Sequence, residues 1–261
     1  MIRVENLVKT FGTVTAVGGI SFDVRPGEIF AFLGPNGAGK TTTIQMLTTL
    51  LRPTSGSIAI DGLDPAARPL EVRRRFGIVF QDPSLDHELT AYENLDLHGV
   101  LYHVPRKVRA ERIESLLTRF ELWDRRDARV KTFSGGMRRR LEIARGFLHT
   151  PRILFLDEPT LGLDPQSRNQ LWTHVRHLNE TEGVTVFLTT HYMDEAERVA
   201  HRIAVIDHGK IVAQGSPDEL KKQTGTDSLE GAFLALTGTS IRDESANAAD
   251  RMRDVVRIWR R

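Results

Sequence analysis

A glycine-rich loop at residues 34–41 limits the folds that this chain can adopt. Its sequence, Gly-Pro-Asn-Gly-Ala-Gly-Lys-Thr, fits the pattern G-x-x-x-x-G-K-[ST], in which glycines let successive backbone N–H groups point at phosphate oxygens. Residues 28–33 form a short, almost entirely apolar run that predicts a buried parallel strand, and residues 42–51 predict a helix. Strand, loop and helix therefore follow in the order of a phosphate-binding α/β unit, with a helix N-terminus directed at the anion.

The loop supplies the first candidate ligand-binding residues. Lys40 would place a cation on the β- and γ-phosphates of a nucleotide, and the hydroxyl of Thr41 can ligate a Mg²⁺ ion between them. We therefore expect ATP and Mg²⁺ as the bound groups. The other candidate nucleotide-binding residues of the loop are Gly34, Asn36, Gly37, Ala38, Gly39 and Thr42.

Composition excludes several classes of protein. The 261 residues include no cysteine, which excludes disulfides, thiolate zinc sites and cysteine nucleophiles and fits a reducing compartment. The formal net charge of +2 is too small to indicate nucleic acid as the partner. Arginine runs such as 73–75 and 138–140 are either solvated faces or partner or membrane contacts. No stretch approaches the roughly 20 apolar residues that span a bilayer, so any membrane role is expected to come through a partner.

Strands and helices alternate along much of the chain. Residues 82–132 are charged and helical in pattern, with a capping box at Thr90 and Glu93, and predict a helical insertion. The predicted strands lie within residues 1–33 and at about 57–60, 76–80, 153–156 and 184–188. Further helices are predicted at about 165–180, 217–225 and 227–236. Alternation of strand, helix and strand indicates an α/β fold with a parallel sheet and helices on its faces.

Two adjacent carboxylates follow the predicted strand at 153–156. Asp157 and Glu158 would lie where an α/β sheet presents its ligand site, at the carboxyl ends of the strands. One carboxylate can hold Mg²⁺ through water, and the next can orient or deprotonate an attacking water. We assign Asp157 to the metal and Glu158 to the base. An acidic pair at a strand end is common by itself, so the interpretation depends on the phosphate loop upstream.

A second glycine motif, Phe133-Ser-Gly-Gly-Met137, precedes the basic helical stretch 138–145. Serine is a favoured helix N-cap and the glycines expose backbone N–H groups, which fits either a second anion-binding helix end or an ordinary capped helix start. The arrangement resembles the signature motif of ABC-type ATPases, whose usual form ends in glutamine where this chain has Met137. The departure puts little in doubt, because the phosphate-facing groups would come from Ser134, Gly135 and Gly136.

The resemblance to ABC-type ATPases extends in order over roughly residues 2–237. It implies a P-loop NTPase core with a mainly parallel sheet, an N-terminal antiparallel β-subdomain and a helical insertion subdomain. Taken singly, the further matching residues have ordinary alternatives: a core aromatic, a strand-end polar group, a helix cap and one histidine among nine. The implied roles are stacking on adenine by Phe11, sensing of Mg²⁺ and the attacking water by Gln81, communication across an ATPase dimer by Asp164, and contact with the γ-phosphate by His191.

Residues 82–95 and 228–238 resemble the daunorubicin-resistance, ABC-2 type export subgroup. This resemblance implies an ATP-hydrolysing subunit that powers a membrane exporter of drug, lipid or polysaccharide-type cargo through closure and reopening of an ATP-bound dimer. The implied partners are a membrane-spanning permease and a second ATPase subunit, expected to be another copy of this chain, and no nucleic acid. The implied location is cytoplasmic, on the inner face of the cell membrane. An ABC importer ATPase and a non-transport mechanical ATPase remain alternatives, and the cargo is not identified.

The expected ATPase domain spans residues 1–237, with the helical subdomain at about 82–150, and a tail of 238–261 follows. In the tail, apolar residues recur at helical spacing among arginines, which predicts a short basic amphipathic helix. Packing on the chain's own body, dimerisation and contact with the anionic inner leaflet are the alternatives for this helix. Its apolar residues are Met252, Val255, Val256 and Trp259.

Overall fold

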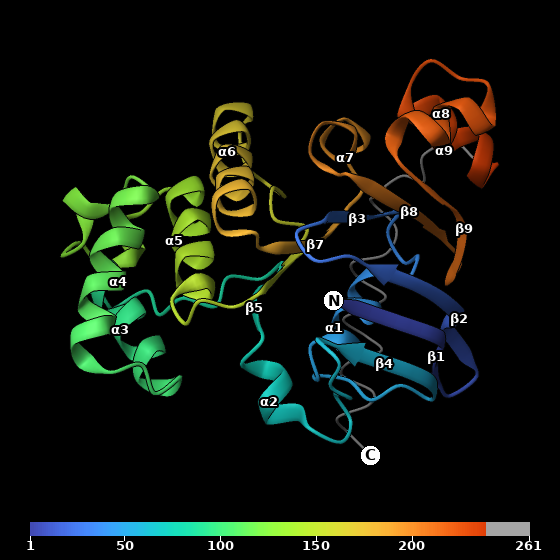
Figure 1. Ribbon diagram of the computed structural model, residues 1–261. Coiled ribbons are helices and arrows are strands. Elements are labelled where there is room, and N and C mark those ends of the chain that lie inside the picture. Colours follow the sequence, from blue (N-terminus) through green and yellow to red (C-terminus); the bar gives the residue numbers. More distant parts are fainter. Residues whose placement is uncertain (239–261) are drawn as a thin grey trace.

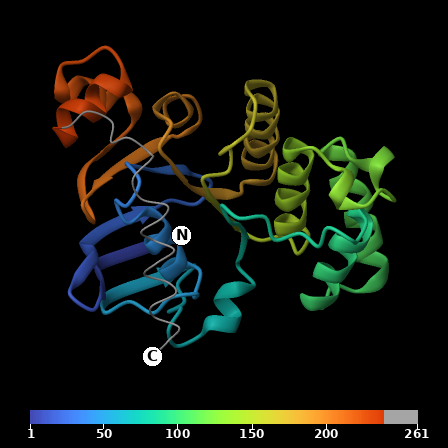
Figure 2. The same cartoon turned by 180° about the vertical axis from the view of Figure 1, so that it is seen from behind.

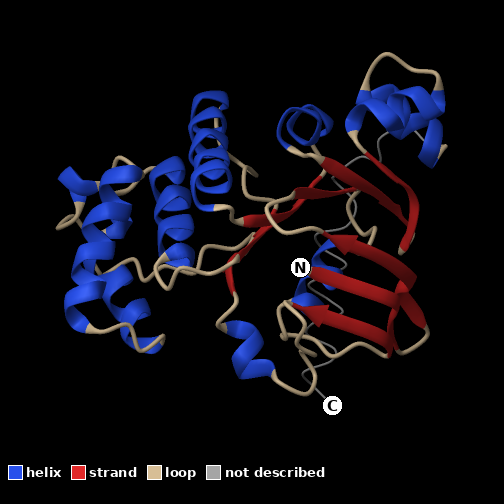
Figure 3. Cartoon of the chain, in the orientation of Figure 1, coloured by secondary structure: helices blue, strands red, loops and turns tan. Residues whose placement is uncertain are grey.

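The computed structural model describes residues 1–238, so the amphipathic helix predicted for the tail lies outside the described residues. Strands and helices of this part form two sheets and a set of surrounding helices (Figures 1 and 3). A small antiparallel sheet has the order β2-β1-β4, with alternating residues buried against the core. Its strands are β1 (Ile2–Phe11), β2 (Val14–Val24) and β4 (Ser55–Ile60).

The larger sheet has six strands in the order β5-β6-β7-β3-β8-β9. All neighbouring strands are parallel except β9, which pairs antiparallel with β8. Every residue of β3, β6 and β7 is buried, which explains their nearly continuous apolar sequences. The strands are β3 (Ile29–Leu33), β5 (Phe76–Val79), β6 (Ile153–Asp157), β7 (Thr185–Thr190), β8 (Arg202–Asp207) and β9 (Lys210–Gly215).

The helices begin at residues suited to cap them. The capping box predicted at Thr90 is present with both of its hydrogen bonds, and Asp164 caps the helix that starts at Pro165. Helix α1 begins at Lys40, directly after the left-handed Gly39. The helices are α1 (Lys40–Leu47), α2 (Pro69–Arg73), α3 (Ala91–Leu101), α4 (Arg106–Arg119), α5 (Gly135–Phe147), α6 (Pro165–Glu182), α7 (Met193–Val199), α8 (Pro217–Thr224) and α9 (Leu229–Thr237), with short 3₁₀ turns at Trp123–Arg125 and Val130–Thr132.

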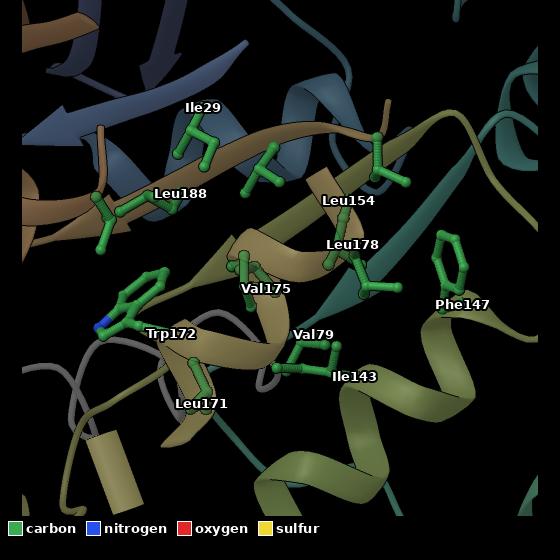
Figure 4. Close-up of a cluster of buried hydrophobic side chains, with 14 of the residues drawn as sticks. Ile29, Val79, Ile143, Phe147, Leu154, Leu171, Trp172, Val175, Leu178 and Leu188 are labelled. Carbon is green, nitrogen blue, oxygen red and sulfur yellow. The ribbon is translucent and has the colours of Figure 1, made fainter. Parts of the chain in front are cut away.

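The six-stranded sheet separates two apolar clusters. Along β3, Ile29, Ala31 and Leu33 face one cluster, and Phe30 and Phe32 face the other. The first cluster joins the sheet to the helices α3 to α9, and Figure 4 shows strand side chains of this cluster meeting those of α5 and α6. The second cluster joins the sheet to α1 and the antiparallel sheet. Figures 1 and 2 accordingly place α3 and α4 at one end of the molecule and the antiparallel sheet at the other.

The expected fold is confirmed: a mainly parallel sheet, an N-terminal antiparallel sheet and a helical insertion. Some details differ from the sequence prediction, which also had no helix at α2 or α7. The helix after the phosphate loop starts at Lys40 and ends at Leu47, whereas residues 42–51 were predicted. No strand was predicted for β8 and β9, whose turn at His208-Gly209 has positive φ at both residues, because His-Gly is not one of the pairs, such as Asn-Gly or Asp-Gly, that mark a hairpin. β8 carries polar residues at both ends, and β9 contains Lys210 and Gln214.

Candidate active site

Three neighbouring parallel strands bring the phosphate loop, the acidic pair and the histidine to one edge of the sheet. Leu33 at the end of β3 pairs with Thr190, and Asp157 at the end of β6 pairs with Thr189. The segments that follow these strands must therefore meet. A hollow of about 460 Å³ lies at this edge. Its lining consists of Ala16, Asn36, Gly37, Gly39, Lys40, Thr41, Thr42, Gln81, Glu158, Leu161 and His191.

The phosphate loop needs its glycines for two separate reasons. Gly37 and Gly39 have φ of 82° and 104°, a left-handed conformation that side chains disfavour. A Cβ atom on Gly34 would lie 2.3 Å from the carbonyl oxygen of Ile206, and one on Gly39 would lie 2.6 Å from that of Ala16. The loop is therefore packed tightly against its neighbours and delivers the chain into the N-terminus of α1, where unpaired N–H groups favour an anion.

Lys40 points back into the curl of the loop. Its ammonium donates hydrogen bonds to the carbonyl oxygens of Gly34 at 2.7 Å and Pro35 at 3.2 Å. The same ammonium lies 3.2 Å from a carboxylate oxygen of Glu158, and only 5% of the Lys40 side chain is exposed. These contacts fix a buried positive charge between the loop and the acidic pair.

Glu158 is held in an uncommon backbone conformation. Its φ is 46°, which costs a residue other than glycine about 1–3 kcal/mol. Its N–H group donates to the carbonyl oxygen and the hydroxyl of Thr189, at 3.1 and 3.0 Å. One carboxylate oxygen contacts Lys40, and the other lies 3.0 Å from Nδ1 of His191. The backbone thus turns this side chain out of the strand and into the hollow.

The charge state of Glu158 follows from these neighbours. Burial acts to raise the pKa of the Glu158 carboxyl, but the hydrogen bond with His191 and the positive charge of Lys40 outweigh it and hold the pKa below its usual value. The carboxylate is therefore ionised at neutral pH. An ionised carboxylate beside a histidine and a lysine can orient a water molecule and accept its proton.

Asp157 lies deeper in the molecule and is 1% exposed. One of its oxygens accepts hydrogen bonds from the hydroxyls of Thr189 at 2.5 Å and Thr41 at 3.4 Å. Burial raises the pKa of the Asp157 carboxyl, and the two hydroxyls only partly oppose this. A carboxylate and a hydroxyl that converge at the phosphate loop are oxygen donors of the kind that Mg²⁺ prefers, so these residues fit the ion. Gln81 lines the same hollow.

The remaining predicted residues do not line this hollow. Ser134 caps α5 by accepting a hydrogen bond from the N–H of Met137 at 3.2 Å, and Ser134 and Gly135 are exposed. A Cβ atom on Gly136 would lie 2.5 Å from Oγ of Ser167, whose N–H and hydroxyl bind the cap residue Asp164. The glycine motif and Asp164 therefore form a second, adjoining surface.

Phe11 is not among the residues that line the hollow. It ends β1 with 47% of its surface exposed, and the ammonium of Lys9 lies 5.0 Å from the centre of its ring. An aromatic ring with an open face at the antiparallel sheet is free to stack on a flat partner. The structure brings no other residue of the predicted site against it, so its role stays a prediction.

Two residues of the site were not predicted from the sequence. Thr189 holds both acidic residues, because its hydroxyl donates to Asp157 and accepts from the N–H of Glu158. The sequence feature that could have identified Thr189 is the pair of threonines, Thr189 and Thr190, at the end of an apolar strand. Arg139 binds the backbone carbonyls of Asp157 and Glu158 from α5. It stands within a run of three arginines, and nothing in that run distinguishes the buried one.

Comparison with known proteins gives consistent matches. A family model described as "ABC transporter" matches residues 17–161. A daunorubicin/doxorubicin resistance ATP-binding protein of Streptomyces peucetius is 49% identical over 228 residues, which are 87% of this chain and 69% of that protein. A Nod factor export ATP-binding protein of Ralstonia nicotianae is 43% identical, covering 88% of this chain and 72% of that protein.

The fold matches a solved structure as well. A dimeric ATP-binding cassette in a post-hydrolysis state, with ADP and phosphate bound, superimposes with a TM-score of 0.74 at 28% sequence identity. The match covers 83% of this chain and 98% of that chain. The similarity thus extends over nearly the whole of that chain.

Proposed function

This chain belongs to the ABC transporter family, whose model matches more than half of its length, and on that premise we propose that it is the ATP-hydrolysing subunit of a membrane exporter. The observation that carries the proposal is the convergence of Lys40, His191 and Glu158 beside the phosphate loop, with contacts of 3.2 and 3.0 Å to the Glu158 carboxylate. A loop alone can bind a nucleotide, whereas an ionised carboxylate next to the loop can also orient or deprotonate the attacking water.

The proposed reaction is attack of water on the γ-phosphorus of ATP. Backbone N–H groups of residues 34–42 and the ammonium of Lys40 would hold the phosphates, and Phe11 would stack on adenine. Glu158 would orient the attacking water or accept its proton. His191 would contact the γ-phosphate and keep Glu158 ionised. The bond between the γ-phosphorus and the bridging oxygen breaks, which releases ADP and inorganic phosphate.

Mg²⁺ would be held by Thr41, Gln81 and Asp157. The bound ion would neutralise negative charge on the phosphates. The chain's own contribution is to aim oxygen donors at one place: Thr189 orients the Asp157 carboxylate, and α1 presents the Thr41 hydroxyl. The raised pKa of Asp157 indicates that the buried carboxylate is costly to ionise by itself, and a cation nearby would offset that cost.

The second surface would complete the ATP site of another subunit. Ser134, Gly135 and Gly136 stand at the exposed start of α5, where a helix N-terminus favours an anion. Asp164 stands next to them through Ser167. In a dimer of two such chains these residues would meet the γ-phosphate bound by the partner, so hydrolysis would remove contacts that hold the subunits together. The relation to a dimeric cassette supports this arrangement.

Attachment to a permease would turn dimer closure into transport. Helix α3 exposes three apolar residues at helical spacing: Leu97 at 51%, Val100 at 49% and Leu101 at 67%. They lie on the helical subdomain, which the segment after Gln81 joins to β5. An exposed apolar stripe of this kind favours a protein partner. We place the cytoplasmic part of a membrane-spanning permease there.

Export is favoured over import because the relatives carry drug-resistance and Nod factor export names. The proposed location is the inner face of the cell membrane, through the permease. Within residues 1–238, none of the helices is long and apolar enough to span a bilayer. The cargo is proposed only as a class, comprising drugs, lipids and polysaccharide-type molecules, since its path lies in the permease.

The experiment that tests this function is purification of the tagged chain from membranes of its native host in mild detergent. We expect a multi-span membrane protein to copurify in stoichiometric amount, as identified by mass spectrometry, together with Mg²⁺-dependent release of phosphate from ATP. Copurification of ribosomal or DNA-repair proteins instead would support a mechanical ATPase and would refute the export proposal.

A further inference from the structure

Arg139 is a buried cation that binds the backbone of the acidic segment. It lies on α5, five residues after Ser134, and is 7% exposed. Its guanidinium donates to the carbonyl oxygens of Pro159 at 2.6 Å, Glu158 at 3.0 Å and Asp157 at 3.2 Å. It also donates to the carbonyl oxygen of Phe80, directly before Gln81. One side chain therefore holds the backbone on both sides of the hollow.

Glu142, one turn further along α5, balances this charge. It is 1% exposed, and one of its carboxylate oxygens accepts a hydrogen bond from Arg139 at 2.9 Å. The other oxygen accepts from the N–H of Ser84 at 2.8 Å. The pair thus connects α5 to residues 80–84, which contain Gln81, and to residues 157–159. A buried ion pair of this kind is stable only because every polar group finds a partner.

The contact with Glu158 has a specific consequence for its side chain. The peptide of Glu158 has a left-handed φ of 46°, which neighbouring structure must enforce. Thr189 fixes its N–H group and Arg139 fixes its carbonyl group. Because the backbone is held from both sides, the Cα–Cβ bond of Glu158 keeps its direction into the hollow, where the carboxylate contacts Lys40 and His191. A guanidinium suits this task, since its planar fork spans several acceptors that a lysine ammonium cannot reach together.

We propose that Arg139 is a positioning residue for hydrolysis, which makes α5 set the geometry of the Glu158 carboxylate in its own subunit. The inference rests on the proposed function and deepens it. The first turn of α5 carries the motif that would meet the partner's nucleotide, and the second turn carries Arg139. When the dimer closes, the first turn of α5 would meet the ATP bound by the partner subunit. The same helix would then transmit this contact to Glu158 in its own subunit.

The test compares Arg139→Gln, Arg139→Lys and a matched control, Arg202→Gln. Arg202 also binds a buried glutamate, Glu28, and a backbone carbonyl, but it lies at the opposite ends of the strands. We expect Arg139→Gln to lower kcat by about 100-fold, as misplacement of a catalytic group does, with unchanged ATP affinity. Arg139→Gln should also lower the melting temperature, because Glu142 loses its cation. Arg139→Lys keeps this charge and should restore the melting temperature, but it should not restore kcat. Arg202→Gln should lower the melting temperature and leave kcat unchanged.

The decisive measurement is the single-turnover rate in a Glu158→Gln background. If Arg139 acts through Glu158, adding Arg139→Gln there should cause no further loss. A further loss of the same size as in wild type, or recovery of kcat together with stability in Arg139→Lys, would overturn the proposal. If the wild-type chain in its native complex hydrolyses no ATP, the proposed function itself is wrong. Hydrolysis by wild type with normal kcat in Arg139→Gln would refute the positioning role alone.

Discussion

Lys40 and Glu158 form an ion pair of 3.2 Å that is almost fully buried. The cation proposed to hold the phosphates thus also contacts the carboxylate proposed to activate water. Phosphate oxygens at the loop would compete with Glu158 for the ammonium. Binding of ATP would therefore loosen Glu158 from Lys40 at the moment when the carboxylate is needed, and it would leave His191 as its main partner.

Replacement of Glu158 by glutamine should separate binding from hydrolysis. The amide keeps the shape of the side chain but carries no charge for Lys40, so we expect ATP to bind at least as tightly as to wild type. Turnover should nearly stop, and an ATP-bound dimer should persist in size-exclusion chromatography. The control is Glu28→Gln, another buried glutamate that contacts Arg202 away from the hollow. Wild-type hydrolysis by Glu158→Gln would refute the assignment of the base.

Removal of the His191 ring should change the pH dependence of hydrolysis. The pKa of Glu158 lies below its usual value because the His191 hydrogen bond and Lys40 outweigh burial. Without the ring, the effect of burial is less opposed and the pKa of Glu158 rises. As the pH falls, the carboxylate therefore becomes protonated at a higher pH than in wild type. We expect the acid limb of kcat to move to higher pH in His191→Ala. His208→Ala, in the exposed turn between β8 and β9, serves as the control. An unmoved acid limb in His191→Ala would contradict this role.

Asp157→Asn should stabilise the nucleotide-free protein while abolishing the Mg²⁺-dependent reaction. Burial raises the pKa of Asp157 above its ordinary 3.8, so the folded state favours the neutral acid. The wild type therefore loses stability relative to Asp157→Asn as pH rises from about 3.8 through the raised pKa. Melting temperatures measured across this range should diverge toward neutral pH, with the variant higher. A variant that melts lower at neutral pH would show that hydrogen bonds to the ionised form dominate.

Gly77 and Gly146 offer a matched test of the packing between β5 and α5. A Cβ atom on Gly77 would lie 2.1 Å from the carbonyl oxygen of Gly146, whereas one on Gly146 would lie 3.6 Å from its nearest neighbours. We expect Gly77→Ala to destabilise the protein by about 1–3 kcal/mol through overpacking. Gly146→Ala should be neutral or stabilising by up to about 1 kcal/mol, because alanine favours a helix. Urea unfolding of both variants measures the difference, and equal losses would contradict it.

Leu101→Lys should break attachment to the permease and leave hydrolysis by the isolated chain intact. The side chain is 67% exposed on α3 and makes no part of the hollow, so a charge there is tolerated in water but not in an apolar interface. Val14→Lys, 65% exposed on the antiparallel sheet, is the control. Copurification with the membrane protein should fall only for Leu101→Lys. Equal recovery with both variants would place the permease elsewhere.

The sequence predicted those parts of the site that are written as contiguous motifs. The glycines of residues 34–41 indicate the backbone conformation of the loop directly. Asp157 and Glu158 stand at the end of an apolar run that is recognisable as a buried strand. His191 was expected beside them only through the resemblance to ABC-type ATPases. Parallel β3, β6 and β7 with aligned carboxyl ends confirm that arrangement.

Contacts that depend on the register of distant segments could not be predicted in the same way. Thr189 donates a hydrogen bond to Asp157 only because the pairing of β6 with β7 places these two residues opposite one another. Arg139 is buried while Arg138 and Arg140 are half-exposed, and only the packing of α5 against residues 157–159 decides which one. The hairpin of β8 and β9 is stabilised by pairing with β3, and this tertiary support leaves little trace in the local sequence.

The two apolar clusters on opposite faces of the six-stranded sheet make the protein modular. Side chains that hold α3 to α6 come from one set of alternating strand positions, and those that hold the antiparallel sheet come from the other. A substitution in the first cluster therefore need not disturb the packing of the antiparallel sheet. Such independence would let the surface proposed to meet a permease change while the packing beneath the proposed ATP site is kept.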